Sequence, residues 1–189
     1  MDIILENLKW MSFNVILALI PIVFGVLMYR NKNIIAKAAF SIIWFFFLPN
    51  TIYLVTDMAH FLKDIKRITG VYLAVDLVLY LTLIILGVVT FIMAIDPFER
   101  MLFKNKSKKK IQEHIPIIYI LNFFVGFGVV LGRIHRLNSW DVFVNTDEVI
   151  FYTLKTLRSF ELMVWVLAFA ILSQFVYMKF RKSVPKVTI

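Results

Sequence analysis

One group of residues with the potential for chemistry follows Pro49. Asn50, Tyr53, Asp57 and His60 recur at intervals of three, four and three residues, so in a continuous helix their side chains share one face. In such a stripe His60 is a weak candidate for a catalytic general base, with Asp57 orienting its ring. Because proline interrupts helices, the same residues also fit a helix end at which Asn and Asp cap the backbone.

A second group contains two arginines, Arg133 and Arg136. They are three residues apart and share a helix face, and the guanidinium fork suits phosphate and carboxylate alike. Asn138 and Asp141 indicate a turn or a helix cap, and Trp140 is typical of a membrane interface. The simpler interpretation is that the arginines anchor the end of a membrane span by snorkelling.

Asp76 is a single ionisable residue near the start of an apolar run. Such a residue is costly in hydrocarbon, so we expect it to face the bundle interior with a partner, unless it lies close enough to the interface to stay hydrated. The chain has no cysteine and only three histidines, which is a poor set of metal ligands. No nucleotide-binding or other cofactor motif occurs. We therefore predict no metal and no cofactor.

The composition identifies the environment of these groups. Of the 189 residues, 61% are hydrophobic and 17% charged, whereas a soluble domain has about 45–50% apolar and about 25% charged residues. A soluble fold of this length could not bury so much apolar surface. In a membrane protein, the net charge of +9 determines orientation across the membrane and favours contact with anionic lipid. We therefore expect no nucleic-acid partner.

Five apolar stretches are long enough to cross about 30 Å of hydrocarbon. We predict an all-α transmembrane bundle, forming a single membrane-embedded domain over residues 1–189. A mixed segment, 141–159, is predicted to form a short amphipathic helix before the last span, capped by residues 145–148, with Ile150, Leu154 and Leu157 on its apolar face. A sixth span would require this segment to insert. The predicted spans are residues 11–29, 34–54, 71–94, 115–131 and 162–178.

The distribution of Lys and Arg predicts how the bundle is oriented. One side carries 13 of the 21 basic residues and the other carries eight, which favours a cell-membrane protein with its N-terminus outside and its C-terminus in the cytoplasm. The strongest contribution comes from the basic run 104–110, which we interpret as a solvated cytoplasmic loop.

This topology brings both polar groups and Asp76 to the outer face. Since opposite charges at a low-dielectric boundary pair, we predict that at least one aspartate forms an ion pair with Arg133 or Arg136. Our first choice is Asp57, because it belongs to the polar stripe, and Asp76 and Asp141 are the alternatives.

The two groups resemble a bacterial family of integral membrane proteins known as domain of unknown function 1361. Ile52 stands where the family often has proline, so the turn after Asn50 is expected to differ. His135 stands where an apolar residue is usual, so it is a poor catalytic candidate. The resemblance implies an integral membrane protein and supplies no activity. The matching residues are 48–50, Tyr53, 56–57 and His60 in the first group, and 132–133, Arg136 and 138–141 in the second.

Two classes of function remain open from the sequence. The first is a non-enzymatic component whose arginines bind an anionic lipid headgroup or a segment of another membrane protein. The second is a membrane-embedded enzyme acting on a lipid-linked phosphate; a small transporter subunit is a further alternative. The expected partners are membrane lipids and a second membrane protein. The candidate ligand-binding residues are Asn50, Tyr53, Asp57, His60, Asp76, Arg133, Arg136, Asn138, Trp140 and Asp141.

Overall fold

The computed structural model describes residues 2–103 and 115–184, and nearly all of them are helical. No strand occurs among these residues, so the predicted all-α fold class is confirmed. The helices are α1 (Asp2–Arg30), α2 (Ile34–Phe47), α3 (Pro49–Thr56), α4 (Met58–Asp64), α5 (Val71–Phe103), α7 (Ile115–His135), α8 (Asp141–Val144), α9 (Thr146–Arg158) and α10 (Phe160–Phe180).

Five segments within the described residues are long and apolar enough to cross a membrane, and they run over Ile3–Arg30, Ile34–Asp64, Val71–Leu102, Pro116–His135 and Phe160–Phe180. The helical segments extend beyond the predicted limits, because backbone hydrogen bonding continues after the apolar sequence ends. The largest difference is in the second span, predicted to end at residue 54. The basic run 104–110 lies outside the described residues.

The second span is interrupted twice. Pro49 lacks an N–H and occupies the first position of α3, so α2 ends just before it. The second break is at Asp57, whose N–H donates to the Leu54 carbonyl at 3.4 Å and whose carbonyl accepts from the His60 N–H at 2.8 Å. Leu48 and Asp57, the residues at the two breaks, both keep right-handed helical angles. The span therefore continues in the same general direction to Asp64.

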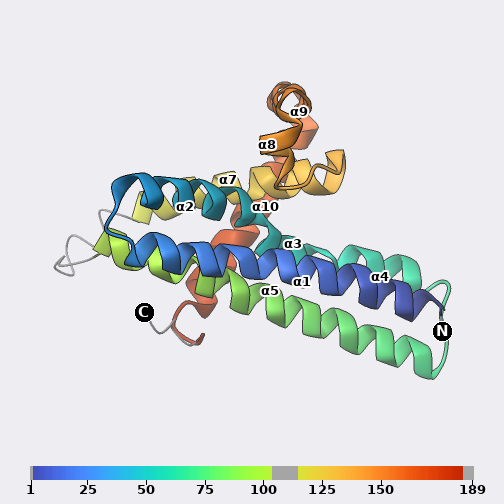
Figure 1. Cartoon of the computed structure of the whole chain (residues 1–189). Helices are drawn as coiled ribbons and strands as arrows, with labels where there is room; N and C mark the ends of the chain where they lie inside the picture. The colour runs from blue at the N-terminus through green and yellow to red at the C-terminus, as the bar shows by residue number, and fades with distance from the viewer. Residues whose placement is uncertain (1, 104–114, 185–189) are drawn as a thin grey trace.

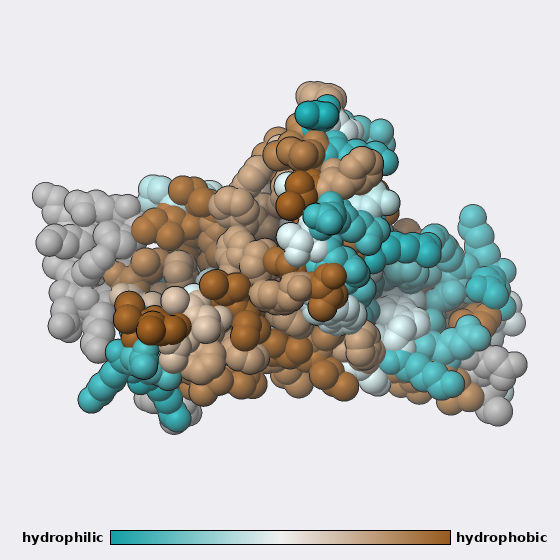
Figure 2. Space-filling view, turned by 45° about the horizontal axis from the view of Figure 1, so that its top comes forward, coloured by the Kyte–Doolittle hydropathy of each residue, from teal (hydrophilic) through white to brown (hydrophobic). Residues whose placement is uncertain are grey.

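The long helices α1 and α5 lie side by side, with α2, α3 and α4 along them (Figure 1). The first turns of α1, all of α4 and the first turns of α5 extend past the end of α7. Figure 2 shows hydrophilic residues gathered at that end, next to a broad hydrophobic surface. The polar groups thus lie where the apolar part of the bundle gives way to a polar end.

Helices α7 and α10 approach closely. A Cβ atom added to Gly126 would lie 2.5 Å from the Val166 carbonyl oxygen and 2.6 Å from the Ala170 nitrogen, so only glycine fits there. Asn122 Nδ2 donates to Gln174 Oε1 at 2.7 Å across the same pair of helices. A small residue and an interhelical amide pair are typical of helix contacts in membranes. This contact fixes α7, which carries Arg133 in its last turn. Arg136 follows the helix with a φ of 59°, so the prediction that the two arginines share a helix face is wrong.

The predicted amphipathic helix before the last span is present as α9, which projects from the bundle with α8 (Figure 1). Its apolar residues Ile150, Leu154 and Leu157 are exposed, as an interfacial helix requires. The predicted capping by residues 145–148 is wrong. The Asn145 side chain makes no cap bond and instead donates to Asp141 Oδ1 at 3.2 Å.

Candidate functional site

Arg133 joins α7 to the second span. Its Nη2 donates to Asp57 Oδ1 at 2.6 Å and to the Tyr53 carbonyl at 3.4 Å, and its Nε donates to Thr56 Oγ1 at 3.1 Å. The guanidinium carbon lies 4.5 Å from the centre of the Tyr53 ring, within cation–π range. The predicted ion pair with Asp57 is therefore present, and the guanidinium is fixed by four contacts.

Asp57 is almost completely removed from solvent, with 1% of its side chain exposed. Its Oδ1 accepts from Arg133, and its Oδ2 accepts from Asn14 Nδ2 of α1 at 3.5 Å. It makes no side-chain cap hydrogen bond, so it pairs across the bundle rather than capping α4. Because an unpaired buried charge is costly, this carboxylate ties together α1, the second span and α7.

His60 lies beside this ion pair. Its Nδ1 is 3.6 Å from Asp57 Oδ1, which is longer than a hydrogen bond and involves the oxygen that Arg133 occupies. The ring packs against Trp10, with 5.5 Å between ring centroids, and 46% of the side chain is exposed. Asp57 therefore pairs with Arg133 and not with His60, and His60 lines the cavity described next.

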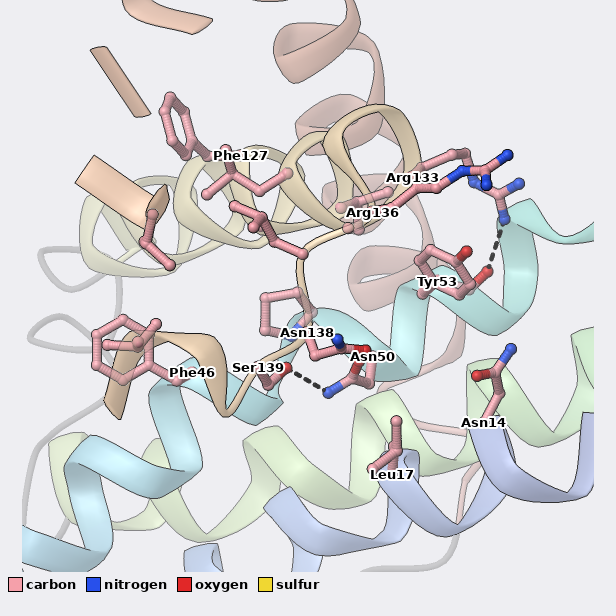
Figure 3. Close-up of a pocket in the computed structure, with 18 of the residues that line it drawn as sticks. Asn14, Leu17, Phe46, Asn50, Tyr53, Phe127, Arg133, Arg136, Asn138 and Ser139 are labelled. Carbon is pink, nitrogen blue, oxygen red and sulfur yellow. Dashed lines mark hydrogen bonds between the residues drawn. The ribbon is translucent and has the colours of Figure 1, made fainter. Parts of the chain in front are cut away.

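A cavity of about 710 Å³ lies between α1, the second span, α7 and the α8–α9 segment. This is the size of pocket that holds an organic ligand. No aspartate or glutamate of the described ranges, 2–103 and 115–184, lines it. Figure 3 shows part of its wall, with Arg133 and Arg136 extending from the end of α7 above Tyr53. Its polar lining consists of Asn14, Asn50, Tyr53, His60, Lys63, Arg133, Arg136, Asn138, Ser139 and Thr153.

Arg136 and Lys63 line the cavity without a carboxylate partner among the described residues. Arg136 is the first residue after α7 and has a φ of 59°, a left-handed conformation that is uncommon for residues other than glycine. Such conformations concentrate at functional sites. With Arg133, three Arg or Lys side chains among the described residues line the cavity, and Asp57 forms an ion pair with only one of them. The site therefore carries two uncompensated positive charges.

The other part of the cavity is aromatic. Phe45 and Phe46 come from the last turn of α2, and Phe124 and Phe127 from the middle of α7. The rings of Phe45 and Phe124 meet edge to face, with centroids 5.6 Å apart. Phe124 precedes Arg133 by nine positions along α7, which corresponds to about 14 Å. The cavity thus joins a cationic end to an apolar end.

A hydrogen bond in the cavity wall joins the polar group that follows Pro49 to the polar group that follows Arg133. Asn50 Nδ2 donates to Ser139 Oγ at 2.8 Å and to the Phe47 carbonyl at 3.0 Å (Figure 3). This bond holds the loop after α7 against the start of α3. Gly128 of α7 packs against Pro49, and an added Cβ there would be 2.4 Å from the Pro49 ring.

Asp141 and Trp140 do not line the cavity. Asp141 Oδ2 accepts from the Asn138 backbone N–H at 2.6 Å and from its side-chain amide at 3.3 Å, and the carboxylate pairs with neither arginine. Its position three residues after Asn138 suits this local loop closure better than a long-range ion pair. Trp140 meets the edge of Phe13, with ring centroids 6.2 Å apart.

Asp76 belongs to a second polar cluster and pairs with neither arginine. Asn7 Nδ2 donates to Asp76 Oδ1 at 2.9 Å and to Asp64 Oδ2 at 3.0 Å, and Tyr80 Oη also donates to Asp64 Oδ2 at 3.0 Å. Asp76 Oδ2 is buried without a hydrogen-bond partner. Trp10 connects the two clusters, because its Nε1 donates to Asn7 Oδ1 at 3.0 Å while its ring contacts His60.

Six of the ten predicted ligand-binding residues therefore line one cavity. Asp57 does not line it but forms an ion pair with Arg133, which does. Sequence reasoning did not select Asn14, Lys63, Ser139 or the phenylalanines. Lys63 follows His60 by three residues and thus continues the helical stripe. Asn7 and Asn14 are seven residues apart on one face of the first span, which is a signal of the same kind.

An all-helical bundle with five apolar spans and a cavity at their polar end defines a multi-pass integral membrane protein. The family described as "Protein of unknown function (DUF1361)" matches residues 13–176, and the chain belongs to this family. No curated protein and no solved structure matches the chain.

Proposed function

We propose that this protein binds the anionic headgroup of a membrane lipid in the cavity between α1, the second span, α7 and α8–α9. The observation that carries this proposal is the excess of positive charge. Arg136 and Lys63 line the cavity without carboxylate partners among the described residues, and Arg133 lines the same cavity while it is paired with Asp57. Arg and Lys side chains held at a membrane boundary are suited to phosphate.

The polar lining supports recognition beyond charge. Asn14, Asn138 and the Tyr53 hydroxyl offer neutral hydrogen-bonding groups around the same space. Given the proposed orientation, with the N-terminus outside, the ligand would come from the outer leaflet. The absence of a hydrogen bond between His60 and Asp57 favours binding over acid–base catalysis.

The test is a titration of the protein in nanodiscs of phosphatidylcholine. Dioctanoyl phosphatidic acid is added, with dioctanoyl phosphatidylcholine as the neutral comparison. Wild-type protein should bind the phosphatidic acid selectively. Lys63→Gln combined with Arg136→Gln should weaken binding about tenfold or more, because a hydrogen bond to a charged group contributes about 1.5–3 kcal/mol.

The matched control is Lys66→Gln. Lys66 is exposed and lies just after the second span, three residues from Lys63, but it does not line the cavity. It should bind as wild type does. Equal binding of both lipids by wild-type protein, or equal weakening by Lys66→Gln, would reject a specific headgroup site.

A further inference from the structure

The cavity is longer than a headgroup requires. Its cationic end lies at the end of α7, and its aromatic end lies about two to three turns deeper, at Phe124 and Phe127. Phe124 is 47% exposed on the surface of α7 although it also lines the cavity. The aromatic end is therefore accessible from the side, where the apolar part of the bundle meets hydrocarbon.

Residues from four elements enclose this end. Phe46 contacts Phe143 of α8 with ring centroids 6.0 Å apart, and Val142 and Val149 line the cavity from α8 and α9. A polar solute would gain nothing from these walls, since all of them are apolar. A hydrocarbon chain attached to a headgroup at Arg136 would be removed from water along them.

We infer that the aromatic end binds the hydrocarbon chain of the same ligand, so that the protein takes up an anionic amphiphile with its chain inside the cavity rather than a free phosphate ion. This inference rests on the proposed function. It specifies the ligand class as a phosphate ester of a long-chain alcohol or an acylated glycerol. The chain enters between α7 and α8 from the membrane side.

The experiment compares inorganic phosphate, butyl phosphate and octyl phosphate by calorimetry below their critical micelle concentrations. The protein is held in phosphatidylcholine nanodiscs, and empty nanodiscs supply the heat of partitioning to be subtracted. Affinity should rise from butyl to octyl phosphate, approaching about fourfold per added methylene if each is fully buried. Equal affinity of wild type for all three probes would overturn the inference while leaving the anion site intact.

Val142→Trp fills the aromatic end and should abolish the rise in affinity from butyl to octyl phosphate. Val144→Trp is the control, because Val144 lies on the same short helix but faces away and is 68% exposed. If Val142→Trp does not fold, Val149→Trp with Ile150→Trp as its control makes the same comparison. If the cavity-filling variant still binds octyl phosphate more tightly than butyl phosphate, the chain binds elsewhere and the inference is overturned.

The two proposals fail differently. If wild-type protein binds none of the three probes, the proposed function itself is wrong. If Lys63→Gln with Arg136→Gln weakens all the probes but chain length has no effect, only the inference about the chain is wrong.

Discussion

Arg133 of α7 donates a 2.6 Å hydrogen bond to the buried carboxylate of Asp57, 76 residues earlier in the chain. The same guanidinium contacts Thr56 and the Tyr53 ring, so one side chain holds the end of α7 against the break between α3 and α4. This ion pair stabilises the fold, and it leaves Arg136 and Lys63 free to act on a ligand. The two arginines should therefore respond differently to mutation.

Arg133→Ala should strongly destabilise the protein, because it leaves Asp57 buried without its cation. Removing one partner of a buried ion pair costs about 3–5 kcal/mol. Arg136→Ala should leave the melting temperature in detergent unchanged, since Arg136 is exposed and forms no ion pair with a described residue. Thermal unfolding of the two variants makes the comparison. Partial recovery in Arg133→Ala combined with Asp57→Ala would identify the ion pair as the cause, and equal melting temperatures for both single variants would contradict it.

Asp76→Asn should leave the stability unchanged or raise it. Asp76 and Asp64 share one donor, Asn7, and neither has a cationic partner among the described residues. The substitution removes a buried charge and keeps an oxygen that can accept from Asn7. Asn7→Ala should instead lower the free energy of unfolding by about 1–3 kcal/mol, because the buried Asp76 carboxylate loses the Asn7 hydrogen bond and Asp64 keeps only the one from Tyr80. A loss in Asp76→Asn as large as that in Asn7→Ala would mean that the charge itself is required.

Gly126→Ala should separate α7 from α10. The added Cβ would meet backbone atoms of Val166 and Ala170, which cannot rotate away, and overpacking of this kind costs about 1–3 kcal/mol. Gly132→Ala on the same helix is the control, because its Cβ would find only ordinary contacts beyond 3.4 Å. The melting temperature in detergent should fall for Gly126→Ala and not for Gly132→Ala. Equal values for the two variants would show that the close approach is not needed.

A reporter fused after Ile189 should indicate the cytoplasm, and one fused near Met1 should indicate the outside. Five spans put the two ends on opposite sides, and the larger share of Lys and Arg favours this direction. If the N-terminus were cytoplasmic and the C-terminus outside, the site would face the cytoplasmic leaflet. Finding both ends on the same side would make insertion of the segment 141–159 the first explanation to test.

The all-α class with five apolar spans and the Asp57–Arg133 pair could be predicted, because helical periodicity and the order of the spans carry them. Helical periodicity placed Asp57 and His60 in one stripe, and topology brought Arg133 to the same end. The aromatic part of the cavity was not predictable in this way. Phe46 and Phe124 look like any other phenylalanines in apolar spans, and only the packing of α2 against α7 makes them a wall. The alternative ion pair of Asp141 with an arginine is absent, because the Asp141 carboxylate accepts local hydrogen bonds from Asn138.

The most direct test of the proposed function is native mass spectrometry of the protein purified from membranes and released gently from detergent. Wild-type protein and Lys66→Gln should retain a phosphate-bearing lipid, identified by its mass and fragmentation. Lys63→Gln combined with Arg136→Gln should lose that lipid while remaining folded. Retention of the same lipid by all three proteins, or its absence from wild type, would contradict an anionic headgroup site in this cavity.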